Sequence, residues 1–193
     1  MIIKFFLARH GQTQWNVLKR LQGRLDSPMT EQGLTQAKQL ATSVASNNIE
    51  LIISSPLPRA KTTAQICQKQ LNLPLYFNEQ LIERDFGSWQ GQLFDSLTEQ
   101  AHFKDVFFKV NQHAPPQGET GLQCAQRFEQ ALQQIANNYR QQHILVVTHG
   151  DMLRCFCHQF NQADFVDAYS QYGNGALFIV NYDTKKQHFS IAT

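Results

Sequence analysis

The sequence predicts an α/β fold, namely a three-layer α/β/α sandwich with a mostly parallel central sheet. Short runs rich in Ile, Phe, Leu and Val recur along the chain, as in strands that are buried on both faces. Between them lie longer segments in which apolar residues return every three or four positions, as in amphipathic helices. Strands that alternate with helices form parallel sheets covered on both faces, and such sheets bind ligands beyond the carboxyl ends of their strands.

Six segments are predicted as strands because they are short, apolar and bounded by polar or turn-forming residues. The last two are expected to form a hairpin-like pair at the edge of the sheet. The segments cover residues 2–8, 51–55, 74–77 and 143–148, followed by the pair 175–183 and 187–193.

Four helices are predicted from apolar residues at helical spacing. Thr30 is a plausible cap for the first helix. The second helix begins near Pro56 and Pro58, which a helix tolerates only in its first turn. The helices lie within residues 30–47, 56–72, about 119–139 and 143–160, and the last of these segments also contains a strand.

Residues 92–117 interrupt this alternation. The segment reads as helical fragments rich in phenylalanine, and it closes at Pro115 and Pro116. We therefore expect one domain over residues 1–193 with a short lid-like insertion at about 92–117.

The composition is that of a globular protein. Of the 193 residues, 42% are hydrophobic and 17% are charged, whereas disordered chains are rich in charge and poor in aromatic residues. The formal net charge is +2, and the Lys and Arg residues form no run, so an extended nucleic-acid surface is not indicated. Mild positive charge suits a small anionic ligand instead.

The expected location is the cytoplasm, with no membrane partner. The apolar opening MIIKFFLA is too short to span a membrane and lacks the features of a signal peptide. The cysteines show no C-x-x-C spacing, so reduced thiols that pack in the core are favoured over a metal site or a disulfide. They are Cys67, Cys124, Cys155 and Cys157. Oligomeric state has no signature in the sequence.

Basic side chains follow three of the predicted strands. Arg9 and His10 come after the first strand, Arg59 after the second, and His149 after the strand at 143–148. The carboxyl ends of parallel strands share one edge of the sheet, so these side chains are expected to meet there. Guanidinium groups match phosphate oxygens bidentately, and a glycine such as Gly150 lets backbone N–H groups approach a ligand. The pattern therefore predicts a pocket for a compact, doubly charged anion such as a phosphate monoester.

Five motifs in order resemble those of the histidine phosphatase superfamily, also called the phosphoglycerate mutase-like family, and the resemblance covers nearly the whole chain. They are ARHGQTQWN, SSPLPRAKTTA, LIERDFGSWQG, GETGLQCAQR and VVTHGDMLR. The resemblance implies a phosphoglycerate mutase-like fold. It also implies that His10 is a nucleophile that becomes phosphorylated, and that Arg9, Arg59 and His149 hold the phosphoryl group. Further candidate phosphate contacts are Asn16, Gln22, Gly23 and Gly150; for Asn16 a local turn or cap is an equal alternative.

Glu83 is the candidate acid that protonates the leaving group. Its position resembles the branch of the family that uses this glutamate, since Gly150 occupies the place of the other branch's aspartate. Asp85 and Asp151 are the alternatives.

No metal or other cofactor is expected, because the arginines supply the charge that Mg²⁺ supplies in many phosphoryl-transfer sites. A metal hydrolase is a weaker alternative, since His10 and His149 lack a third ligand at suitable spacing. The remaining histidines match no motif and are interpreted as structural or exposed. They are His102, His113, His143, His158 and His188.

Phosphomonoester hydrolysis is the favoured activity, on a small phosphorylated metabolite. A cofactor-dependent phosphoglycerate mutase is the alternative, but the insertion carries only Lys104 and Lys109 as cations, whereas such mutases typically carry a longer, arginine-rich one. A non-catalytic phospho-ligand binder is a third hypothesis, although such proteins usually lack the nucleophile. The phenylalanines of the insertion suggest tolerance of an apolar or aromatic substrate portion.

Overall fold

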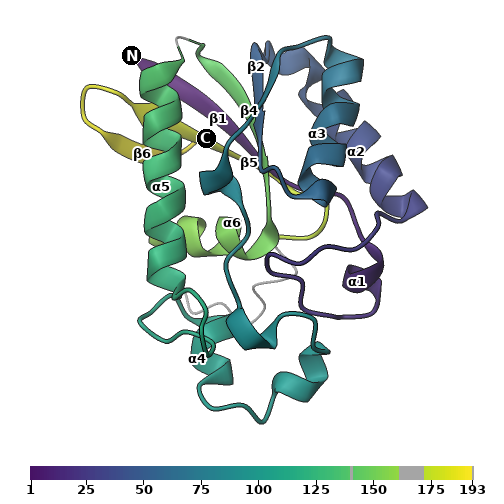
Figure 1. Ribbon diagram of the computed structural model, residues 1–193. Coiled ribbons are helices and arrows are strands. Elements are labelled where there is room, and N and C mark those ends of the chain that lie inside the picture. The colour runs from purple at the N-terminus through teal and green to yellow at the C-terminus, as the bar shows by residue number, and fades with distance from the viewer. Residues whose placement is uncertain (140, 161–171, 193) are drawn as a thin grey trace.

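The computed structural model describes residues 1–139, 141–160 and 172–192, and in these ranges one six-stranded sheet forms the centre of the molecule (Figure 1). The strands are β1 (Ile2–Arg9), β2 (Leu51–Ser54), β3 (Leu75–Phe77), β4 (His143–Thr148), β5 (Leu177–Asp183) and β6 (His188–Ile191). Their order is β3-β2-β4-β1-β5-β6. β3, β2, β4 and β1 pair in parallel, and β5 pairs antiparallel with β1 and β6. The mostly parallel sheet is therefore confirmed.

Helices cover both faces of this sheet. The α-helices of the described residues are α1 (Gln14–Val17), α2 (Glu31–Val44), α3 (Pro58–Leu71), α4 (Phe103–Phe108), α5 (Gly121–Asn138) and α6 (Gly150–Cys157). In Figure 1, α2 and α3 lie on one side of the sheet, and α5 and α6 lie on the other. This is the predicted three-layer arrangement.

The side chains of β1 alternate between the two faces. Ile3, Phe5 and Leu7 are buried in a cluster with apolar residues of α5 and α6, whereas Phe6 and Ala8 are buried with residues of α2 and α3. Alternate residues of a strand point to opposite faces, so an unbroken apolar run can fill two cores at once.

Local capping explains where the helices begin. Thr30 caps α2, because its hydroxyl oxygen accepts a hydrogen bond from the Gly33 amide at 3.0 Å, as predicted. Pro58 occupies the first position of α3. α5 begins at Gly121 rather than near residue 119, because Thr120 and Gln123 form a capping box.

The C-terminal hairpin differs from the prediction. β5 is not at an edge, since it pairs with β1 over Ile2–Ala8 as well as with β6. Among the described strands, β6 is the edge strand on this side. The apolar character of β5 reflects this position inside the sheet. Thr193, the end of the predicted last strand, lies outside the described residues.

The insertion has an apolar cluster of its own. Phe103 and Phe107 are buried together with Phe86, Trp89, Val106 and their neighbours. These two phenylalanines are four residues apart on α4 and therefore share one helix face. Most of the phenylalanine surface of the insertion is thus used for its own packing. Within the described ranges, no helix combines the length and apolar character that crossing a membrane requires.

Candidate active site

The basic residues identified from the sequence lie beyond the carboxyl ends of three adjacent strands. Arg9 ends β1 and is in register with Thr148, which ends β4. His10 and His149 follow directly, and Arg59 is the second residue of α3, the helix after β2. Because β2, β4 and β1 are neighbours in the sheet, the loops that carry these residues converge.

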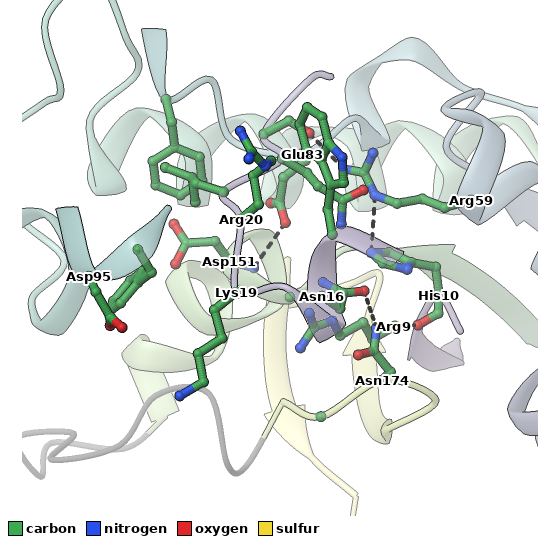
Figure 2. A pocket seen from close by; sticks show the side chains of 18 residues that line it. Arg9, His10, Asn16, Lys19, Arg20, Arg59, Glu83, Asp95, Asp151 and Asn174 are labelled. Atoms are coloured by element: carbon green, nitrogen blue, oxygen red, sulfur yellow. Dashed lines mark hydrogen bonds between the residues drawn. The ribbon is translucent and has the colours of Figure 1, made fainter. Parts of the chain in front are cut away.

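A cavity of about 700 Å³ opens at this edge (Figure 2). Its volume suits a small metabolite. Eight of the nine site residues predicted from the sequence line it, namely Arg9, His10, Asn16, Gln22, Gly23, Arg59, Glu83 and Gly150. The ninth, His149, is fully buried beside His10, with 5.2 Å between the ring centroids, and is not among the lining residues.

His10 is held as a neutral imidazole with a lone pair on Nε2. Its Nδ1 lies 2.7 Å from the Gly11 carbonyl oxygen, which can only accept, so Nδ1 carries the proton. Arg59 Nε donates to His10 Nε2 at 3.1 Å. Burial lowers the pKa of His10 well below its usual value, and the charges of Arg59 and Arg9 lower it further.

Arg59 is fixed by the polar loop that follows β1. Its Nη1 donates to the Leu25 carbonyl at 2.8 Å and to Asp26 Oδ1 at 2.7 Å, and its Nη2 donates to the Gly23 carbonyl at 2.6 Å. The Arg59 side chain is buried, whereas that of Asp26 is 24% exposed. These contacts aim the remaining Nε at the histidine.

Arg9 packs directly on the backbone of Gly150. A Cβ at position 150 would lie 2.9 Å from Arg9 Cζ, which is closer than carbon atoms approach without a clash. Arg9 Nη1 donates to the Tyr172 carbonyl at 2.5 Å. Glycine at position 150 therefore lets the guanidinium lie flat against the start of α6.

His149 is oriented by Ser55. The distance between His149 Nε2 and Ser55 Oγ is 2.7 Å, and His149 Nδ1 is buried without a hydrogen-bond partner in the described part of the chain. The pKa of His149 lies well below its usual value, mainly because the ring is buried. The charges of Arg59 and then of His10 lower this pKa further. The ring is therefore neutral near pH 7.

Asn16 takes the local capping role that its sequence position left open, and it also faces the cavity, whereas phosphate contact stays a prediction. Its Oδ1 accepts from the Thr13 amide at 3.0 Å, as part of a capping box at α1, and its side chain also lines the cavity. Asn174 Nδ2 donates to the same oxygen at 3.1 Å and to the His10 carbonyl at 3.2 Å (Figure 2). Gln22 Nε2 donates to the Thr13 hydroxyl at 2.9 Å. The polar loop is thus tied to the backbone of His10.

Glu83 lies at the start of α6 with its carboxyl group against backbone amides. It accepts from the amides of Arg84 and Met152, both at 2.9 Å, and of Asp151 at 3.2 Å. Burial raises the pKa of Glu83, and the neighbouring Asp151 carboxylate raises it further. A buried carboxyl group that lines the cavity and holds its proton to higher pH is suited to acid catalysis.

The two alternative acids are placed differently. Asp151 accepts from Arg84 Nη1 at 3.1 Å and from Arg154 Nε at 2.5 Å. Burial acts to raise the pKa of Asp151, but the two guanidinium groups outweigh it, and the pKa is lowered. Asp85 is paired with Arg24 at 3.2 Å and does not line the cavity. Asp151 is therefore a buried ion-pair partner, and neither aspartate is suited to donate a proton.

Two cavity cations were not identified from the sequence. Lys19 and Arg20 line the cavity together with Trp15, and Arg20 Cζ lies 5.5 Å from the Trp15 ring centroid. Two adjacent basic residues in the loop after β1 were the available signal. Arg84 was also missed, because its importance comes from partners far away in the chain, such as Asp151.

The fold and this site define an α/β protein with a basic, histidine-bearing cavity at the carboxyl edge of its sheet. A family profile described as histidine phosphatase superfamily (branch 1) matches residues 5–192. The chain belongs to this superfamily, whose members are phosphatases or mutases.

Similar proteins include both types. Probable phosphoglycerate mutase GpmB of Escherichia fergusonii is 34% identical over 156 residues, which cover 80% of this chain and 73% of the relative. The solved structure of YhfR from Bacillus stearothermophilus is 30% identical, with a TM-score of 0.86 over 99% of this chain and 96% of the other. Phosphoserine phosphatase of Entamoeba histolytica in complex with 3-phosphoglyceric acid is 26% identical, with a TM-score of 0.80 over 99% and 95% of the two chains.

Proposed function

We propose that this protein hydrolyses the phosphomonoester of a small metabolite through a phosphohistidine at His10. The observation that carries the proposal is the state of this side chain. Its neutral imidazole presents Nε2 next to Arg59, within a cavity that Arg9 also lines. Neutral imidazole is a good nucleophile toward phosphorus. Transfer of the phosphoryl group first to the enzyme and then to water replaces direct attack by water, which is the harder reaction.

The reaction then has two steps. Once substrate binding has moved the Arg59 Nε–H from His10 Nε2 to a phosphoryl oxygen, His10 Nε2 attacks phosphorus. The bond from phosphorus to the ester oxygen breaks, and Glu83 gives its proton to the departing alkoxide. Water next attacks the phosphohistidine, Glu83 takes a proton from this water, and phosphate leaves with His10 restored. The raised pKa of Glu83 supports its acid role in the first step.

The charge of the phosphoryl group is proposed to be balanced by Arg9 and Arg59, with His149 Nδ1 as a further donor. If the Ser55 hydroxyl donates to His149 Nε2, the imidazole proton is on Nδ1, the atom without a partner in the described ranges. Phosphate binding would also require Arg59 to exchange a contact with the loop. The one to Asp26 is the best candidate, since Asp26 is partly exposed.

Hydrolysis is favoured over mutase activity for two reasons. The insertion contributes Phe94 and Asp95 to the cavity wall, and neither is a cation that could hold a phosphoglycerate carboxylate. The similarity to phosphoserine phosphatase is also consistent with hydrolysis. The mutase is kept as the second candidate, because the curated relative carries that name and because Lys19 and Arg20 could hold a second anionic group.

We also propose that the chain is one domain in which residues 92–117 act as a lid on this cavity. The wall positions of Phe94 and Asp95 support this. The cytoplasm is the proposed location, and the four free, buried cysteines fit a reducing compartment.

The test is a panel of phosphorylated metabolites assayed with a chelator present. Phosphate release is measured beside interconversion of 2- and 3-phosphoglycerate, for the wild type and for His10→Ala. We expect phosphate release that His10→Ala abolishes. Fast interconversion with little free phosphate would establish the mutase instead, and activity that survives in His10→Ala would contradict the phosphohistidine route.

A further inference from the structure

The insertion brings together two histidines and an aspartate that the proposed reaction does not use. His102 precedes α4, Asp105 lies in its first turn, and His113 lies in the loop after it. One potential ligand atom from each residue lies within 4.8 Å of the other two. None of the three lines the cavity, so the group is separate from the candidate active site.

The side chains face one another rather than solvent alone. His102 Nδ1 lies 3.6 Å from Asp105 Oδ2, and the rings of His102 and His113 meet edge to face with centroids 4.2 Å apart. Lys109 Nζ donates to the other carboxylate oxygen, Asp105 Oδ1, at 2.8 Å. The oxygen that faces His102 is thus distinct from the one that binds the lysine.

His113 supplies an independent indication of a ligand. Its Nδ1 is buried and has no hydrogen-bond partner within the described residues. Burying a polar nitrogen without a partner costs free energy, and a metal ion that accepts its lone pair would remove that cost. The backbone around this ring is fixed, because the His113 amide donates to Asn111 Oδ1 at 2.8 Å and its carbonyl accepts from Arg84 Nη2 at 3.4 Å.

We propose that His102, Asp105 and His113 bind a Zn²⁺ ion that joins the start of α4 to the loop after it. Two imidazole nitrogens and one carboxylate oxygen are a donor set that Zn²⁺ accepts, and water can complete the tetrahedron. Zn²⁺ holds such ligands at about 2.0–2.2 Å, so tetrahedral ligand atoms lie roughly 3.3 Å apart. Rotation of the His102 side chain, which is 60% exposed, would bring the ligand atoms from the observed spacing to this value.

Such an ion would act on the insertion rather than on the chemistry. It would cross-link two segments that otherwise meet through side-chain packing, and it would fix the loop whose carbonyl receives Arg84. Because the ion stabilises only the folded arrangement, Zn²⁺ should raise the melting temperature. This role holds whether or not the cavity hydrolyses phosphate esters.

The experiment titrates tag-free, chelator-stripped protein with Zn²⁺ by calorimetry and with Co²⁺ by absorption spectroscopy. We expect one Zn²⁺ per chain and a visible Co²⁺ spectrum without thiolate charge-transfer bands, since the donors are nitrogen and oxygen. His102→Gln and His113→Gln should each weaken Zn²⁺ binding by at least roughly tenfold, since loss of an outer-shell partner alone costs that much. The melting-temperature rise should disappear in parallel.

Matched controls locate the site. Lys109→Gln keeps all three ligands and removes a competing cation, so Zn²⁺ should bind as tightly as in the wild type or more tightly. His188→Gln changes an exposed histidine on β6 and should leave binding intact. No Zn²⁺ binding by the wild type, equal binding by His102→Gln and the wild type, or a Co²⁺–thiolate spectrum would each overturn the proposal. Because His102 is exposed, its substitution tests binding without threatening the fold.

Discussion

Glu83 and Asp151 are neighbouring buried carboxyl groups whose surroundings shift their pKa values in opposite directions. Burial and the Asp151 charge raise the pKa of Glu83. Burial also acts on Asp151, but Arg154 and Arg84 outweigh it and lower the pKa. In enzymes, two neighbouring titratable groups whose pKa values are shifted in opposite directions often divide the acid and base roles between them. This contrast supports the proposal that Glu83 transfers the proton, whereas Asp151 stays charged.

Replacement of Glu83 by glutamine removes the proposed acid and keeps one oxygen, which can still accept from the amides of Arg84 and Met152. We expect alkyl phosphates to lose about 10²- to 10⁴-fold in kcat, because their leaving alkoxide needs a proton, whereas p-nitrophenyl phosphate loses much less. Steady-state kinetics on both substrates check this. Equal losses of kcat on the two substrates would indicate that another residue is the acid.

The same groups predict the pH dependence. The pKa of His10 is lowered, so kcat/KM should rise as pH increases through that value and His10 loses its proton. The pKa of Glu83 is raised, so kcat/KM for alkyl phosphates should fall as pH increases through that value and the acid loses its proton. The Glu83→Gln variant should lack the alkaline decline, and a decline that persists in it would rule out Glu83 as its source.

Asp151→Asn separates a structural role from an acid role. Asp151 is 3% exposed and is shared by two buried guanidinium groups, so its loss leaves buried charge uncompensated. We expect destabilisation of about 3–5 kcal/mol in urea unfolding. The ratio of alkyl to aryl phosphate rates is measured on the acidic side of the alkaline decline, because loss of the Asp151 charge should also lower the pKa of Glu83. There the ratio should stay near that of the wild type, and a collapse of this ratio would make Asp151 the acid.

At the scale of elements, the start of α6 organises the site. The Arg9 guanidinium packs against its first residue, Gly150, and the backbone amides of its next two residues donate hydrogen bonds to the Glu83 carboxyl group. A helix N-terminus is a natural place for a negatively charged group. One short helix thus positions both Arg9, the proposed phosphate-binding cation, and Glu83, the proposed acid.

Gly150→Ala tests this arrangement. The added Cβ would displace the Arg9 guanidinium, and misplacement by about 1 Å can cost roughly 10²-fold in rate. We expect kcat/KM to fall by that order. Gly121→Ala, at the first position of α5, is the matched control, because its Cβ meets Val110 away from the cavity. Equal activity of both variants would show that Arg9 does not depend on Gly150.

At the scale of elements, the sequence predicted those features that depend on a short stretch of neighbouring residues. Residues 2–8 read as a strand because burial on both faces requires an unbroken apolar run, and Thr30 was recognisable as a cap. The position of β5 inside the sheet depends on pairing with β1 at the other end of the chain, which no local pattern records.

The same limit applies to the site. His10 and Arg9 were predicted because an Arg-His-Gly sequence directly follows a strand. Arg84 pairs with Asp151 across 67 positions, and Asn174 reaches Asn16 across 158. No periodic sequence pattern records separations of this length. His102 and His113 of the insertion meet only because the loop after α4 returns the chain to the start of that helix.

For the whole molecule, Arg84 joins three parts of the structure. Its guanidinium donates to the carbonyls of Val106 in α4 and Glu119 before α5, both at 2.9 Å, and to Asp151 in α6. One fully buried side chain, Arg84, therefore contacts the insertion, the segment before α5 and α6. Coupling between the insertion and the cavity has a physical route through this residue.

Overall stability should depend on pH through the buried histidines. The folded-state pKa of His10 is lowered, so below its unfolded pKa of about 6.5 only the unfolded chain gains a proton. The free energy of unfolding should therefore fall from about pH 6.5 downward, by up to about 1.4 kcal/mol per pH unit for this group. Urea unfolding of His10→Gln from pH 7.5 to 5 should show a shallower decline. Parallel curves for the two proteins would mean that His10 is protonated in the fold.

The most direct measurement is to capture the phosphorylated enzyme. The protein is mixed with excess substrate, quenched in alkali to preserve phosphohistidine, digested and sequenced by mass spectrometry. We expect one phosphoryl group on His10, appearing and decaying at rates compatible with turnover, and none in the His10→Ala variant. An active enzyme whose phosphoryl group is found on another residue, or that turns over at full rate with no phosphorylated His10 at any time, would contradict the proposed chemistry.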